Sequence, residues 1–134
     1  MVNQLVVTQT LTEQMIQAGA DLVRALDDAG MNVTSALWFY LEDSDTWRLI
    51  FGSPTVAAEG PKRFYEGVQR VLTAKEQGVG ISLRDITVVA PNDSSLLLLR
   101  PAIATGSTGI AGIRFSRNTI NGHFIRDAYI YRLS

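Results

Sequence analysis

Residues 34–51 read TSALWFYLEDSDTWRLIF, two runs of β-favouring residues separated by a short acidic segment. The residues EDSD (42–45) suit a tight turn, so the two runs predict an antiparallel hairpin. The first run, SALWFYL, is apolar on both faces of the strand it would form, and such a strand belongs in the middle of a sheet. We therefore expect this hairpin to build the centre of the sheet.

Amphipathic helices are predicted on both sides of this hairpin. Residues 11–28 carry apolar side chains at helical spacing, and Thr10 and Glu13 have the spacing of a capping box at the start. Residues 61–77 have the same kind of apolar stripe, and Pro61 suits a first helical turn because any N–H there would lack a partner within the helix. Each helix would bury its stripe against the sheet.

The segments after the second helix predict a short strand and one ambiguous element. ITVVA (86–90) is a short apolar run that predicts a buried strand, ending at Pro91. Residues 94–100 contain four leucines and fit either a short helix or a buried strand, because periodicity cannot separate the two over so few residues. The residues NDSS favour a capped helix, and Pro101 favours its end near Arg100.

The C-terminal part of the chain predicts a second hairpin. Residues 111–120 alternate apolar and polar side chains, as in a half-exposed strand. The Asn-Gly pair at 121–122 favours a type I′ turn, because both residues tolerate a positive φ. The returning strand is HFIRDAYIYRL (123–133), and strict alternation places three of its side chains on one face: Tyr129, Tyr131 and Leu133.

These elements follow the order α-β-β-α-β-(α)-β-β within a single domain that spans residues 1–134. Strands joined by tight turns predict an α+β fold: an antiparallel or mixed sheet of about five strands, with the two main helices (11–28 and 61–77) on one face. The chain lacks the regular alternation of strand and helix that a Rossmann fold requires.

The composition indicates that another protein chain covers part of the surface. Hydrophobic residues make up 46% of the chain and charged residues 19%, and the mean hydropathy is +0.11. A typical domain has about a quarter charged residues, so this one is short of polar surface. We therefore expect a homo-oligomer or a protein partner.

The absence of cysteine excludes disulfides, thiol catalysis and thiolate metal sites. No basic segment precedes the first apolar run, as it would in a signal peptide. No apolar run approaches the ~20 residues that span a bilayer. These features predict a cytoplasmic protein without a membrane segment.

Charge is unevenly distributed along the chain. Residues 1–60 carry a net charge of −6 and residues 100–134 a net charge of +4, although the whole chain carries −1. Such polarity can mark an anion-binding face or head-to-tail self-association, and folding can also neutralise it within one chain. Asp27 and Asp28 oppose the dipole of the first helix, so we expect them to meet solvent or a partner. A pI near 5.7 argues against nucleic acid as a partner.

The glycine-rich segment ATGSTGIAG (104–112) lacks the motifs of a phosphate loop. Gly106 and Gly109 are three residues apart, which breaks the dinucleotide fingerprint, and no lysine occurs after Lys75 to complete a Walker A loop. Both motifs also need a helix after the loop, whereas a strand is predicted here. We expect a flexible connection.

The strongest candidate site is the hairpin RFSRNTINGHFIR (114–126), which holds cationic and amide side chains and no acid. Guanidinium groups can hold a phosphate or carboxylate by paired hydrogen bonds. The candidates for binding a small anionic ligand or a partner are Arg114, Arg117, Asn118, Asn121, His123 and Arg126. The candidates for an aromatic pocket or an interface are Trp38, Tyr40 and Trp47.

No spacing in the chain indicates catalysis. His123 is the only histidine, and Asp127 would lie roughly 13 Å from it along one strand. No serine lies in a G-x-S-x-G elbow, and no cluster has the spacing of a metal site. We predict no catalytic residue, no metal and no cofactor.

The leading hypothesis is a small non-catalytic binding or assembly module that self-associates, as a homodimer. The alternative is an enzyme or sensor that binds a small anionic ligand through the arginine-rich C-terminal hairpin.

Overall fold

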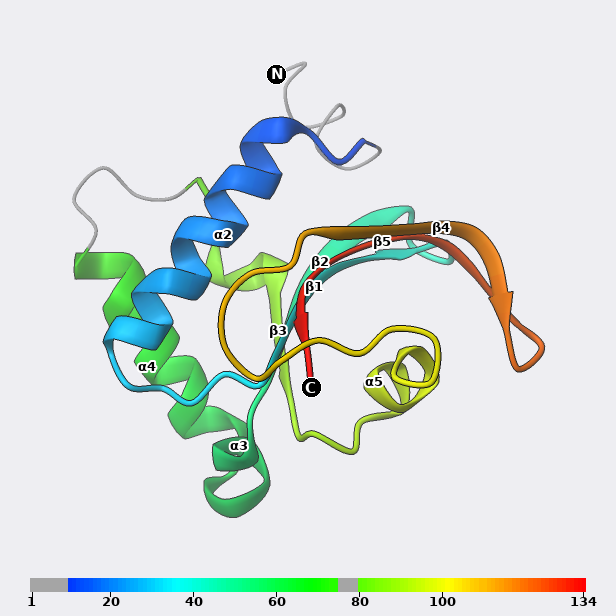
Figure 1. Cartoon of the computed structure of the whole chain (residues 1–134). Coiled ribbons are helices and arrows are strands. Elements are labelled where there is room, and N and C mark those ends of the chain that lie inside the picture. The colour runs from blue at the N-terminus through cyan, green and yellow to red at the C-terminus, as the bar shows by residue number, and fades with distance from the viewer. Residues whose placement is uncertain (1–9, 75–79) are drawn as a thin grey trace.

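The computed structural model describes residues 10–74 and 80–134 (Figure 1). In chain order its elements are α2 (Glu13–Asp28), β1 (Ser35–Leu41), β2 (Thr46–Gly52), α3 (Pro54–Glu59), α4 (Pro61–Ala74), the 3-10 turn η1 (Leu83–Asp85), β3 (Ile86–Val89), α5 (Ser94–Leu99), β4 (Ile113–Ile120) and β5 (His123–Leu133). The α+β class is confirmed, and the order of the elements broadly follows the prediction. The ambiguous segment at 94–100 is the helix α5.

The five strands form one mixed sheet in the order β3-β2-β1-β5-β4. All neighbours pair antiparallel except β2 and β3, which are parallel because α3 and α4 connect them. The strand β1 lies in the middle, as its two apolar faces predict. The helices α2 and α4 cover one face of the sheet, and α5 covers the other (Figure 1).

Two layers of buried side chains fill the space between the sheet and its helices. The layer under α2 and α4 includes Leu22, Leu26, Leu49, Phe51 and Phe64. The layer under α5 includes Leu37, Ile50, Leu96, Leu99 and Ile130. Because neighbouring residues of β1 and β2 alternate between the two layers, both strands are buried on both faces. Among the residues that the structure describes, no helix has the length and apolarity needed to cross a membrane.

The first helix begins later than predicted. α2 starts at Glu13, and Thr12 is its N-cap: the Thr12 Oγ1 accepts a hydrogen bond from the Met15 N–H at 3.1 Å. The capping-box prediction for Thr10 is therefore wrong. The cap must immediately precede the first helical residue, and Thr10 lies two positions too early.

The connection after the first hairpin contains a helix that the sequence analysis did not predict. Pro54 begins α3, and the Ser53 hydroxyl caps it by accepting a hydrogen bond from the Thr55 N–H at 3.1 Å. A Ser-Pro pair suits the N-cap and first position of a helix as well as it suits a turn. The second predicted helix, 61–77, is described as far as Ala74, and its last residues lie outside the described part of the chain.

An extra residue in β5 changes which side chains face the helices. Ala36 pairs with Arg132 and Leu37 pairs with Ile130, so Tyr131 has no opposite residue on β1. Such a bulge puts Tyr131 and Arg132 on the same face, toward α2. Leu133 therefore belongs to the layer under α5, and the prediction that it shares a face with Tyr131 is wrong.

Tyr131 and Trp38 join α2 to the sheet through a chain of hydrogen bonds. The Trp38 Nε1–H donates to the Tyr131 hydroxyl at 2.9 Å, and this hydroxyl donates to the Ile16 carbonyl at 2.7 Å. Burial raises the pKa of Tyr131 well above its ordinary value. Gly19 lies directly against this pair, with no side chain to separate helix and sheet.

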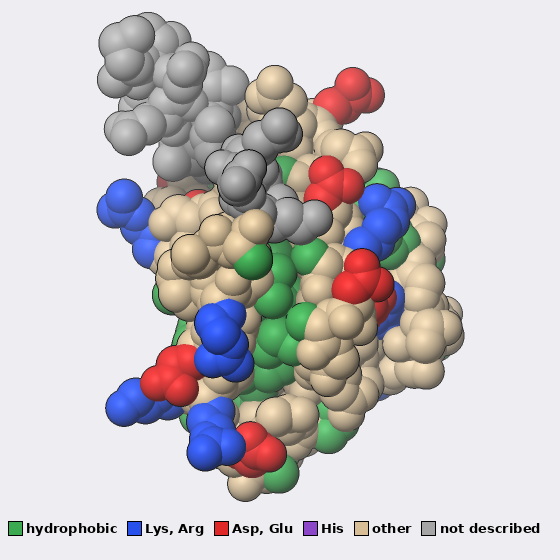
Figure 2. All heavy atoms as spheres, turned by 90° about the vertical axis from the view of Figure 1, so that its left-hand side faces the viewer, with side chains coloured by type: hydrophobic (Ala, Val, Ile, Leu, Met, Phe, Trp, Pro, Cys, Tyr) green, Lys and Arg blue, Asp and Glu red, His purple; other side chains and the backbone are tan. Residues whose placement is uncertain are grey.

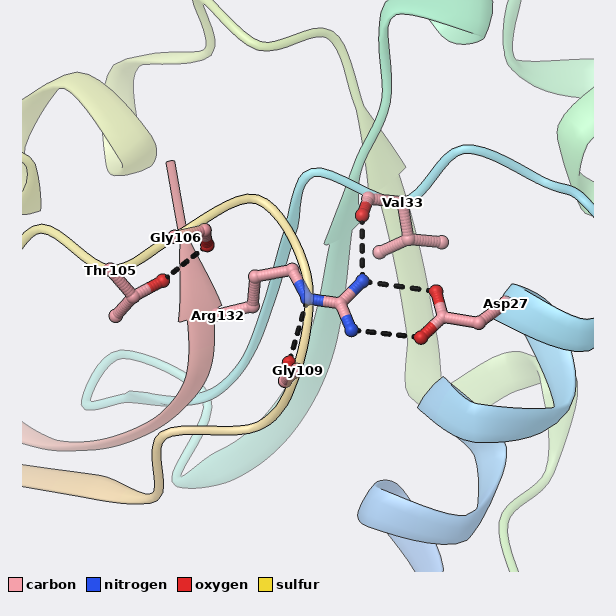
Figure 3. Close-up of polar contacts among 6 residues, drawn as sticks. All are labelled: Asp27, Val33, Thr105, Gly106, Gly109 and Arg132. Atoms are coloured by element: carbon pink, nitrogen blue, oxygen red, sulfur yellow. Dashed lines mark hydrogen bonds and ion pairs between the residues drawn. The ribbon is translucent and has the colours of Figure 1, made fainter.

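Arg132 connects the glycine-rich segment to the end of α2 through hydrogen bonds and an ion pair (Figure 3). Its guanidinium donates to both carboxylate oxygens of Asp27 at 3.0 and 2.8 Å. It also donates to the carbonyls of Val33 at 2.8 Å and Gly109 at 2.9 Å. The glycine-rich segment thus supplies an acceptor for a buried cation, and Asp27 has its partner within the same chain. One acid of the N-terminal part is thus paired with one arginine of the C-terminal part inside the same molecule.

Candidate functional site

Two groups of sequence candidates meet in one hollow of about 350 Å³. The hollow lies on the α2 side of the sheet, where β1 pairs with β5 of the β4–β5 hairpin. Its lining residues are Tyr40, Trp47, Arg114, Ser116, Arg117, Arg126 and Asp127. The structure thus brings three of the predicted arginines together with two of the predicted aromatic residues.

A bend in the hairpin brings two of the arginines to this surface. Strict alternation would place Arg126 and Asp127 on opposite faces of β5, yet both line the hollow. Ile125 and Ala128, three residues apart, both belong to the layer under α5. Between Ile125 and Ala128, the side chains of β5 therefore depart from strict alternation between the two faces of the sheet. On β4, opposite this place, Arg117 has a positive φ of 49°. Figure 1 shows both strands curving toward α5 near their hairpin end.

Arg114 and Asp127 form the wall of the hollow as a bidentate ion pair. The Arg114 Nε and Nη2 atoms each lie 2.6 Å from a different carboxylate oxygen of Asp127. The hydrogen bond to Asp127 raises the pKa of Arg114. The charge of Arg114 is already balanced by Asp127. Arg114 therefore fixes the shape of the wall and adds little to the attraction of an anion.

Aromatic side chains form the opposite side of the hollow and support Arg126. Tyr40 and Trp47 pack edge to face, with ring centroids 5.3 Å apart. The Arg126 guanidinium lies 5.7 Å from the centroid of the Tyr40 ring and 3.3 Å from a carboxylate oxygen of Glu42. The Tyr40 hydroxyl donates to the Asp45 carboxylate. These contacts hold Arg126 at the rim, where its side chain is 53% exposed.

Two hydrogen-bond donors of the hollow have no acceptor among the described residues. The Arg117 side chain is exposed and forms no ion pair or hydrogen bond with the described part of the chain. Trp47 is only 7% exposed, and its Nε1–H is buried without a partner there. A buried donor left unpaired costs about 1–3 kcal/mol, and the side chain that carries this donor is part of the lining of the hollow.

The other predicted residues lie elsewhere. Trp38 is 3% exposed and belongs to the layer under α2 and α4, bonded to Tyr131. Asn118, Asn121 and His123 are exposed near the hairpin end and do not line the hollow. Asn121 and Gly122 have φ values of 50° and 80°, as the predicted type I′ turn requires. The ring of His123 is 3.1 Å from the carbonyl of Asn121.

The site candidates of the sequence analysis did not include Ser116 and Asp127, although both line the hollow. Alternation along β4 does put Ser116 beside Arg114, and that pattern was a usable signal. Nothing local signals Asp127, because its role comes from pairing across two strands. Within residues 10–74 and 80–134, no group of three or more acidic, histidine or cysteine side chains could hold a metal ion.

Comparison with known proteins gives no family to which this site could be referred. No protein-family model, no curated protein and no solved structure matches the chain.

Proposed function

We propose that the protein is a small binding module that holds an anionic group, a phosphate or a carboxylate, in the hollow between the β1–β2 hairpin and the β4–β5 hairpin. Arg117 and Arg126 supply the positive charge, and the Trp47 Nε1–H supplies a buried neutral donor. The observation that carries the proposal is that Arg117, which has no ion pair or hydrogen bond with the described chain, lines the same hollow as Arg126.

The charge of the lining supports an anion over a cation. Three arginines and one aspartate line the hollow, and the aspartate is engaged with Arg114 by two hydrogen bonds. An anion would therefore meet two guanidinium groups that lack a bidentate partner in the described chain. Each charge-assisted hydrogen bond of this kind contributes about 1.5–3 kcal/mol.

The acids beside the hollow support a small ligand. Glu42 and Asp45 line an adjoining polar hollow that shares Tyr40 and Arg126 with the first. A second anionic group reaching into that space would meet two carboxylates and be repelled. The ligand class is therefore a compact anion, and the proposal assigns no reaction to it. The cytoplasmic location expected from the sequence is part of the same proposal.

Replacing Arg117 with alanine is expected to weaken binding of inorganic phosphate by about tenfold or more, because the main unpaired cation of the hollow is lost. Isothermal titration at matched ionic strength measures the affinity. Arg24→Ala is the matched control, since Arg24 is an exposed arginine on α2 that pairs with Asp21 and does not line the hollow. Equal affinities for the wild type and both variants, or no binding by any of them, would contradict the proposal.

Trp47→Phe is expected to lower the affinity for phosphate by about two- to tenfold, because a neutral hydrogen bond contributes about 0.5–1.5 kcal/mol. Phenylalanine keeps an aromatic ring against Tyr40 and removes the donor. Phosphate should also change the tryptophan fluorescence of the wild type and not that of the variant, whose remaining Trp38 lies outside the hollow. An unchanged affinity would show that the Nε1–H takes no part.

A further inference from the structure

The outer side of the helical layer carries a groove of about 870 Å³ that the anion site does not use. It runs along α4 and past the end of α2. Its apolar or small lining residues include Met31, Phe64, Gly67, Val71 and Ala74. Figure 2 shows this side of the molecule, where hydrophobic side chains form a band with charged side chains beside it.

A glycine at the floor of the groove makes room for a methionine side chain. A Cβ atom at Gly67 would meet the end of the Met31 side chain at 2.5 Å. Gly67 therefore lets the Met31 side chain approach α4 closely, and Phe64 on the same helix is 2% exposed. The result is a depression with apolar side chains at its floor and charged side chains beside them.

Four charged side chains line the same groove along one stripe of α3 and α4: Glu59, Arg63, Glu66 and Arg70. Arg63, Glu66 and Arg70 share one side of α4 because they are spaced three and four residues apart, and Glu59, the last residue of α3, pairs with Arg63 across the break at Gly60. The charges alternate in sign along this stripe. Glu59 and Arg63 lie 3.7 Å apart, with side chains 50% and 74% exposed, so both remain accessible to a partner.

This order of charges is complementary to itself under a two-fold rotation. Positions 63 and 66 lie equally far along α4 from the point between residues 64 and 65, and Glu59 and Arg70 flank them on the two sides. If a second copy packs its α4 antiparallel across this point, Arg63 faces the second copy's Glu66, and Glu59, which lies beside the start of α4, comes near the second copy's Arg70. The symmetry repeats both pairs, so every facing pair has opposite signs.

We propose that this groove is the interface of a two-fold homodimer, in which α4 of one copy packs antiparallel against α4 of the other. The apolar floor supplies buried area at the centre, and the charged stripe sets the register and orientation. The high proportion of hydrophobic residues and the low proportion of charged ones agree with a covered surface. The interface lies apart from the anion site, since the two hollows share no lining residue.

Charge variants test the register directly. Arg63→Glu/Arg70→Glu makes the stripe wholly acidic, and Glu59→Arg/Glu66→Arg makes it wholly basic. Facing like charges cost several kcal/mol, so each variant alone should dimerise at least about 100-fold more weakly than the wild type. A 1:1 mixture of the two should recover association as a heterodimer, because opposite charges then face each other at every pair.

Sedimentation equilibrium over a range of concentrations measures the dissociation constants, and circular dichroism confirms that each variant is folded. Lys62→Glu is the control, because Lys62 lies on α4 outside the groove and its replacement should leave dimerisation unchanged. The proposal is overturned by a monomeric wild type, by folded charge variants that dimerise as the wild type does, or by a mixture that fails to associate.

Discussion

Arg132→Ala is expected to lower the free energy of unfolding by about 3 kcal/mol, because breaking a buried ion pair costs about 3–5 kcal/mol. The Arg132 side chain is 2% exposed and donates to Asp27 and to the carbonyls of Val33 and Gly109. Alanine would remove these donors and leave buried acceptors unpaired. The Asp27 side chain is 39% exposed, so water can hydrate its charge in the variant, and this keeps the loss near the lower end of the range.

Urea denaturation followed by circular dichroism measures this loss. Arg24→Ala is the control, because the Arg24–Asp21 pair is exposed and such pairs contribute about 0–1 kcal/mol. Asp27→Asn should lie between the two, since an amide keeps one acceptor for the guanidinium. If Arg132→Ala is no less stable than Arg24→Ala, the buried network does not hold the glycine-rich segment to α2.

Gly19→Ala is expected to destabilise the protein by about 2–3 kcal/mol through overpacking. A methyl group at Gly19 would lie 2.7 Å from the Tyr131 Cζ and 2.9 Å from the Trp38 Nε1, and closer still to the Tyr131 hydroxyl. Either α2 moves away from the sheet or Tyr131 moves, and both changes disturb the hydrogen bond from Tyr131 to Ile16.

The sign of this effect separates packing from helix propensity. Propensity alone favours alanine over glycine inside a helix by about 1 kcal/mol, so without the contact Gly19→Ala would stabilise α2. Gln17→Ala is the control, because Gln17 is an exposed residue of the same helix and its replacement should change stability by less than about 0.5 kcal/mol. A thermal melting temperature for Gly19→Ala at or above that of the wild type would show that helix and sheet are not in close contact at this point.

Most of the secondary structure could be predicted because its signals are local. The apolar stripes of α2 and α4, the two apolar faces of β1 and the Asn-Gly turn each depend on residues within a few positions of one another. The errors also have local causes. Thr10 and Thr12 are both of a residue type that caps helices, and only the start of α2 at Glu13 selects Thr12; a Ser-Pro pair likewise fits a turn as well as the start of α3.

The candidate site could be predicted only in separate parts. Composition singled out the arginines of the second hairpin and the aromatic residues of the first, but nothing in the sequence indicated that Arg117 and Trp47 line the same hollow. That proximity results from β1 pairing with both β2 and β5, which brings two distant hairpins side by side. Simple alternation also fails at Arg117 and Arg126, because the bend changes the face of the sheet toward which these side chains point.

The sequence by itself determined the class of fold and most of the order of the elements, and it singled out the arginines that we propose bind an anion. Hydrophobic periodicity and turn chemistry act between near neighbours, so they can be read along the chain. Only the tertiary structure decided where the side chains of β5 point, because the bulge at Tyr131 and the bend near Arg126 arise from pairing with β1 and β4. These two irregularities direct the Arg132 side chain toward Asp27 and the Arg126 side chain toward the hollow.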